Sequence, residues 1–87
     1  MHAVVSTVRI EDLESARAAL PEQRLKLVSR APGFVSAYWL EPVGGVGMSV
    51  IIFQTRKHAE EAVAYPVPPL PGVTLLTVDI REVYASA

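Results

Sequence analysis

The feature that most constrains this fold is a set of short segments that are apolar on both sides of an extended chain. Successive side chains on a β-strand point to opposite faces of a sheet, yet residues 50–53 read Val-Ile-Ile-Phe without a polar interruption. Residues 4–5 and 75–76 repeat this pattern on a smaller scale. A sheet with one face in water would alternate apolar and polar side chains. The sequence therefore predicts a sheet that is covered on both faces.

Four extended segments and two helical segments alternate along the chain. β-Branched and aromatic side chains predict strands over residues 3–10, 34–40, 48–55 and 73–84. Apolar residues at helical spacing predict helices over residues 13–30 and 56–64, with Asp12 and Thr55 as N-caps. Pro21 falls inside the first helix, where a missing N–H and a bulky ring predict a break or a kink.

Proline and glycine mark the connections between these elements. Residues 41–45 predict a turn that joins two strands into a hairpin, and Pro32 and Gly33 end the first helix. Residues 65–72 hold four prolines within six positions, a composition that fits neither a helix nor a central strand. A polyproline ligand motif has a similar composition. We favour a stiff crossing loop, because most loops of this kind only connect two elements.

The resulting order, strand–helix–strand–strand–helix–strand, is the ferredoxin-like arrangement of an α+β domain with a four-stranded antiparallel sheet. Right-handed crossovers place both helices on one face of that sheet. Tyr38 and Trp39 are neighbours on a strand, so one of them must point away from the helices. The sequence does not fix which one, because a register step reverses every side chain. Exposed apolar patches usually mark interfaces, so we expect a homodimer with sheets packed face to face.

Composition limits the kinds of function. The 87 residues suit one domain, residues 1–87. Without cysteine there are no disulfides, thiolate metal sites or cysteine nucleophiles, and we expect neither a metal nor a cofactor. A net charge of −1 gives no attraction to nucleic acid or anionic membranes. No apolar run approaches the roughly 20 residues of a membrane span, and no signal-peptide pattern is present, so we expect a cytoplasmic protein.

Several junctions together resemble a known family. The first helix ends in Ala-Pro-Gly-Phe-Val at residues 31–35, and a hairpin strand carries Tyr-Trp-Leu at residues 38–40. The next strand, through residues 50–55, leads directly into a short helix containing Ala59 and Ala62. Over nearly its whole length the chain resembles the dimeric α+β barrel superfamily, which includes the antibiotic-biosynthesis-monooxygenase-like domains.

This resemblance implies a homodimer whose two sheets close into a barrel, with a pocket between each sheet and its helices. Members include cofactor-independent quinol or polyketide monooxygenases, haem-degrading enzymes, small-lactone isomerases and stress-responsive proteins. The haem-degrading members depend on an asparagine, a tryptophan and a helix-borne histidine. This chain has no asparagine, which argues against haem degradation. The family pattern specifies the fold well and the function poorly.

Few residues could carry chemistry. His58 can act as an acid or a base, although a histidine in the first turn of a helix more often faces solvent. The candidate ligand-binding residues are aromatic: Tyr38, Trp39, Phe53 and Tyr65. Aromatic residues on strands more often belong to a core or a dimer interface than to a ligand site. The strand serines lack the sequence context of a nucleophile: Ser6, Ser36 and Ser49.

Three functions remain open from the sequence. The first is a cofactor-independent monooxygenase-like enzyme that acts on a small aromatic or polyketide substrate, with His58 as its base. The second is a non-catalytic homodimer that binds a small apolar ligand. The third is a structural or partner-binding role, with the pocket filled by the protein's own side chains. The shortage of polar pocket residues favours the second and third, because converging polar groups normally mark a catalytic site.

Overall fold

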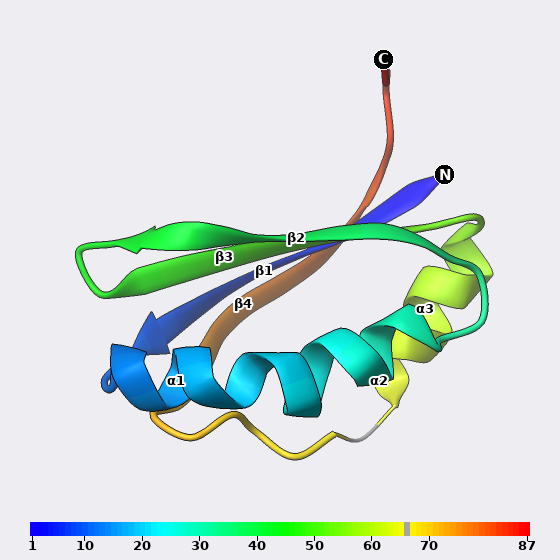
Figure 1. Cartoon of the computed structure of the whole chain (residues 1–87). Helices are drawn as coiled ribbons and strands as arrows, with labels where there is room; N and C mark the ends of the chain where they lie inside the picture. The colour runs from blue at the N-terminus through cyan, green and yellow to red at the C-terminus, as the bar shows by residue number, and fades with distance from the viewer. Residues whose placement is uncertain (66) are drawn as a thin grey trace.

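The computed structural model describes residues 1–65 and 67–87. Pro66, which the sequence assigns to the crossing loop, lies outside the described residues. The elements follow the expected order, with the first helical segment divided into three contiguous parts (Figure 1). They are β1 (His2–Ile10), α1 (Leu13–Leu20), η1 (Pro21–Leu25), α2 (Lys26–Ser29), β2 (Phe34–Val43), β3 (Val46–Phe53), α3 (Arg56–Ala64) and β4 (Val73–Glu82).

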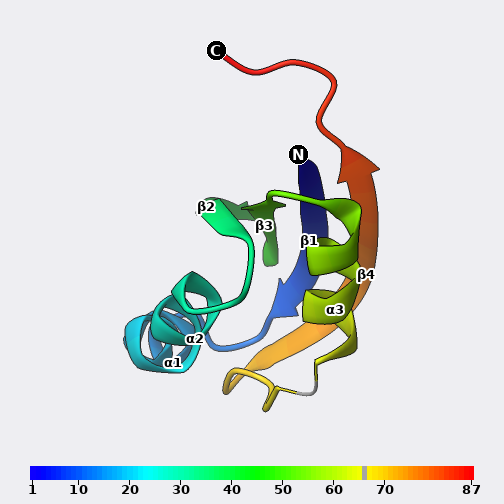
Figure 2. The same ribbon diagram turned by 90° about the vertical axis from the view of Figure 1, so that its right-hand side faces the viewer.

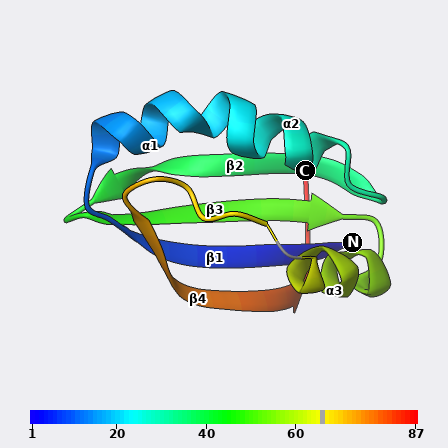
Figure 3. The same cartoon turned by 90° about the horizontal axis from the view of Figure 1, so that it is seen from below.

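The four strands form one antiparallel sheet in the order β2-β3-β1-β4. Strand β3 lies between β1 and β2, as the split connection through the first helix requires. All helices lie on the same side of the sheet, and within residues 1–65 and 67–87 no helix or strand covers the other side (Figures 1 and 2). Viewed from the helical side, α1 and α2 follow β2 while α3 lies near β1 and β4 (Figure 3). The α+β class and the four-stranded antiparallel sheet are thus confirmed.

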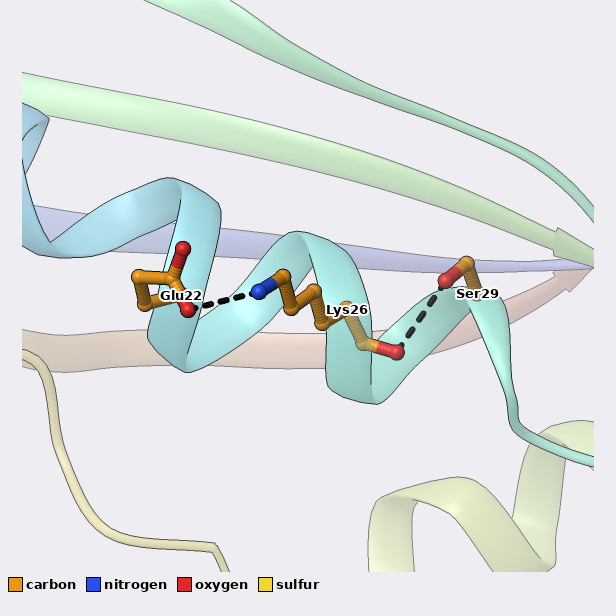
Figure 4. A network of polar contacts seen from close by, with 3 residues as sticks. All are labelled: Glu22, Lys26 and Ser29. Carbon is orange, nitrogen blue, oxygen red and sulfur yellow. Dashed lines mark hydrogen bonds and ion pairs between the residues drawn. The ribbon is translucent and has the colours of Figure 1, made fainter.

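The first helix passes Pro21 without breaking. A proline inside a helix lacks an N–H and crowds the carbonyl four residues before it. Here the chain widens into the π-helical turn η1, in which the Lys26 N–H donates to the Pro21 carbonyl, five residues back. An exposed ion pair of 2.8 Å between Glu22 and Lys26 spans this turn, and the Ser29 hydroxyl donates to the Lys26 carbonyl (Figure 4). Of the expected break or kink, the structure shows no break but an interruption of the α-helix at Pro21 in the form of one wide turn.

Both predicted N-caps are confirmed. The Asp12 carboxylate accepts hydrogen bonds from the Ser15 hydroxyl at 2.8 Å and from the Ser15 backbone N–H at 3.1 Å. These two bonds favour the charged form and hold the pKa of Asp12 below its ordinary value. At the start of α3, the Thr55 hydroxyl accepts from the backbone N–H of His58 at 3.2 Å. Each cap satisfies an amide that the helix itself leaves unpaired.

The hairpin between β2 and β3 is tighter than the sequence suggested. Gly44 and Gly45 both have positive φ, 59° and 77°, as a two-residue turn of the mirror-image type requires. Strand β2 therefore continues through Pro42 to Val43, where the expected turn over residues 41–45 would have ended it. An irregular register between Leu40 and Val43 accommodates the proline, which an edge strand tolerates because it lacks a neighbour on one side.

The hydrophobic core lies at one end of the domain. Val4, Phe53 and Ala59 form its buried centre, where α3 meets β1 and β3. Further partly buried residues pack around this centre: Ala31, Phe34, Ile51, Ala62 and Ile80. Beneath α1 the buried side chains are few, and Ala16 is the only one in that helix with less than a tenth of its surface exposed. The helical layer is therefore anchored at the α3 end and stands away from the sheet elsewhere.

Candidate functional site

A cavity of about 1000 Å³ separates the helical layer from the sheet. The α1–η1–α2 layer borders it on one side and α3 on the other, while residues 67–72 cross beneath the middle of the sheet (Figures 2 and 3). Short side chains face this space from three elements, Ala16 on α1, Gly47 and Ser49 on β3 and Ser6 on β1, while the helical layer also lines it with larger ones: Leu13, Leu20, Leu27 and Val28. The cavity volume is at the upper end of the range common for small-molecule sites.

Alternate residues of the strands form most of the wall of this cavity. A register irregularity between Thr7 and Val8 adds one residue to β4, so that Leu75 and Val78 both line the cavity although three positions separate them. The strand residues of the wall are mostly apolar: Val4, Ser6, Val8 and Ile10 from β1, Trp39, Leu40, Glu41 and Pro42 from β2, Gly47, Met48, Ser49, Ile51 and Phe53 from β3, and Val73, Leu75 and Val78 from β4.

The structure places four of the five predicted site residues at the cavity. Trp39 and His58 line it half-buried, Phe53 closes its core end with 2% of its surface exposed, and Tyr65 lies at the rim after α3. Tyr38 does not line the cavity. It is on the opposite face of the sheet with 59% of its surface exposed. The open question of register is thereby answered, since Trp39 faces the helices and Tyr38 faces outward.

His58 is held more firmly than a first-turn residue in solvent would be. Its Nδ1 lies 2.8 Å from the Thr55 hydroxyl, so proton transfer at this ring would use Nε2. The backbone of Gly33 packs against the ring so closely that a Cβ on Gly33 would lie 2.3 Å from the His58 Cγ. The side chain is half-buried among residues that line the cavity, and the solvent-facing alternative does not describe it.

Three arginines line the cavity: Arg17, Arg24 and Arg30. Arg17 forms an exposed ion pair with Glu41 across the gap between α1 and β2. Arg24 donates from Nη2 to the Pro68 carbonyl at 2.7 Å, which ties η1 to the crossing loop. Partial burial disfavours the charge and lowers the pKa of Arg24. Arg17 and Arg24 therefore find polar partners within the chain itself, whereas Arg30 is exposed at the C-cap of α2.

Sequence reasoning missed the two serines of the cavity wall. Ser6 and Ser49 were set aside because neither has the context of a nucleophile. The register of β1 and β3 pairs them directly, and both line the cavity. The alternation of apolar residues along β1 and β3 is the signal that could have revealed this pairing, because it fixes the register of the two strands.

The outer face of the sheet divides into an apolar and a polar half. On β2 and β3 the strand alternation places Tyr38, Leu40, Met48, Val50 and Ile52 there, and at the hairpin end Leu40 and Met48 also border the cavity. On β1 and β4 the hydroxyls of Thr7 and Thr77 form a hydrogen bond, and Arg81 pairs with Asp79 at 2.6 Å. This apolar half of the outer face explains why residues 50–53 of β3 are apolar on both sides of the strand.

No family model, no curated protein and no solved structure matches this chain. Topology carries the fold assignment: an α+β domain with a four-stranded antiparallel sheet, compatible with the ferredoxin-like arrangement. Within residues 1–65 and 67–87, no three or more histidine, cysteine, aspartate or glutamate side chains gather into a metal site. In the same part of the chain, no helix is both long and apolar enough to cross a membrane.

The packing of Gly33 on His58 gives a testable expectation. Gly33→Ala should lower the free energy of unfolding by roughly 2–4 kcal/mol, because alanine must adopt a φ of +76° and its Cβ meets the imidazole. Gly44→Ala is the matched control, since its φ is +59° but nothing lies within 4 Å of a Cβ there. The control should lose only about 1 kcal/mol. Urea denaturation followed by circular dichroism measures both, and equal losses would contradict the contact.

Proposed function

We propose that this chain is the subunit of a homodimer that binds a small apolar molecule between its sheet and its helices. The observation that carries the proposal is the cavity of about 1000 Å³ with mostly apolar walls. Protein interiors are normally packed as densely as organic crystals, so a space of this size leaves its lining without contacts. An apolar ligand would supply those contacts and release water from the walls.

A second function is favoured by the position of His58. The resemblance to the monooxygenase-like domains implies oxidation of an activated aromatic substrate by O₂, without a cofactor. In such a reaction a CH₂ group of an anthrone becomes a carbonyl, and the second oxygen atom leaves as water with the two hydrogens. His58 lines the cavity with Nδ1 engaged by Thr55, which leaves Nε2 to take a proton from the substrate. Oxygen uptake with dithranol that His58→Gln abolishes would support catalysis, whereas uptake no faster than in buffer would leave binding alone.

The homodimer is supported by the apolar half of the outer face. Tyr38 and Leu40 each expose half or more of their surface, and Met48 exposes 40%. An apolar patch of this kind suits a second copy of the same face, with the polar half on β1 and β4 left toward the rim. The resemblance to dimeric α+β barrels implies the same packing. The dimer would cover the outer face of the sheet, whose apolar side chains predict that it is not left in water.

Blocking the cavity tests ligand binding. Val8 lies in the middle of the wall on β1, so Val8→Phe should fill the space and weaken binding of N-phenyl-1-naphthylamine, an uncharged probe that fluoresces out of water, at least tenfold. Ala18→Phe is the control, because Ala18 is exposed on α1 and does not line the cavity. Fluorescence titration measures both. Equal affinities in the two variants, or no saturable binding to the unmodified protein, would contradict the proposal.

Placing a charge on the outer face tests the dimer. We expect sedimentation velocity to give twice the 9.4 kDa mass of one chain at micromolar concentration. Val50→Arg should shift the protein to the single-chain mass, because the interface would bury an unpaired charge. Leu25→Arg, on an exposed position of η1, should leave the dimer unchanged. A single-chain mass for the unmodified protein would refute the interface.

A further inference from the structure

The middle of the cavity wall carries one row of polar groups across three neighbouring strands. The sheet register pairs Trp39 of β2 with Ser49 of β3, and Ser49 with Ser6 of β1. Directly opposed residues on adjacent strands have Cβ atoms about 4.5–5.5 Å apart. All three residues line the cavity, so the residues that carry an indole N–H and two hydroxyls are aligned across its wall. We call Trp39, Ser49 and Ser6 the polar row.

Apolar pairs flank the polar row on both sides. Toward the core end, Val4 is paired with Ile51, and toward the hairpin end Val8 is paired with Gly47. Beyond Ser6, the row ends at Val78 of β4. The polar row is therefore a short interruption at the centre of an apolar wall, and a ligand that fills the cavity would lie across it.

The hydroxyls of the polar row form no side-chain hydrogen bond within the described part of the chain, a property they share with Ser36 and Thr74 but not with several other hydroxyls. Those of Thr7, Thr77, Ser15 and Ser29 all form hydrogen bonds with protein groups. Across residues 1–65 and 67–87, no side-chain hydrogen bond joins Ser6, Ser49 or Trp39 to another protein group, although all three residues are half-buried. Among the described side chains only His2 Nδ1 is both fully buried and without a partner, so the polar atoms of the row remain accessible to a ligand that displaces water from them.

The chemistry of the polar row selects the kind of ligand. An indole N–H only donates a hydrogen bond, and each hydroxyl can donate one. Of the three arginines that line the cavity, Arg17 pairs with Glu41, Arg24 binds the Pro68 carbonyl and Arg30 is exposed at the end of α2. The row itself contains no charge that would balance an anion or a cation. It therefore suits an uncharged oxygen acceptor.

We propose that the polar row binds the carbonyl oxygen of an uncharged apolar ligand, such as a ketone, an ester or a quinone. This inference rests on the proposed ligand function and narrows its ligand class. The carbonyl accepts from the Trp39 indole N–H and from a serine hydroxyl, while the apolar remainder of the ligand fills the cavity toward both flanking pairs.

Two isosteric probes test the carbonyl preference. In 2-acetylnaphthalene a C=O occupies the position that C=CH₂ occupies in 2-isopropenylnaphthalene, so the two differ in the acceptor and little in shape. Trp39 is the only tryptophan, and its indole gives a single cross-peak in a ¹H–¹⁵N spectrum. We expect the ketone to bind about tenfold more tightly than the alkene and to move the indole proton downfield.

Serine substitutions assign that preference to the polar row. The double variant Ser6→Ala, Ser49→Ala should lose most of the tenfold preference while keeping its affinity for the alkene. Ser36→Ala is the matched control, because Ser36 lies on β2, is paired with Ile52 and does not line the cavity. Retained alkene binding shows that the double variant is folded. If it does not fold, the comparison of the two probes on the unmodified protein still decides.

The outcomes separate this inference from the function on which it rests. Equal affinity of the unmodified protein for both probes would overturn the role of the polar row and leave the cavity as an apolar binding site. A carbonyl preference that survives in the double serine variant would likewise overturn it. Saturable binding of neither probe would overturn the proposed function and this inference together.

Discussion

The structure depends on a shortage of large side chains beneath its first helix. Phe53 and its neighbours fill the space under α3. Under α1, by contrast, Ala16 faces the sheet, and Gly47 and Ser49 of β3 face the helical layer. A helix and a sheet close upon each other only when side chains interlock between them. The layer is thus packed at one end and open at the other, and the cavity follows directly from the residues that are small.

The connections keep that space open. The wide turn at Pro21 lets the helical layer continue past a residue that would otherwise break it. The crossing loop is held at its end by a bond of 2.7 Å from the Glu11 N–H to the Gly72 carbonyl, and near its middle by Arg24. Because proline has no N–H and restricts the chain, this loop spans the gap without folding into it.

Local signals in the sequence predicted most of the fold. Asp12 and Thr55 began the helices as expected, and α3 occupies the residues assigned to it. The details that failed depend on interactions between distant residues. The strand length near Pro42 follows from pairing with β3, and the continuity at Pro21 follows from backbone bonds that no residue type encodes alone. Likewise, the pairing of Ser6 with Ser49 becomes visible only when two strands are set in register.

The one-sided core has a consequence for how the domain opens. Buried side chains cover the backbone hydrogen bonds near Val4 and Phe53. These hydrogen bonds should open only when the whole domain unfolds. Helix α1 covers the cavity with few buried contacts, and its amides exchange with solvent through smaller, local openings. We therefore expect slow hydrogen exchange around the core and faster exchange in α1, the helix over the cavity.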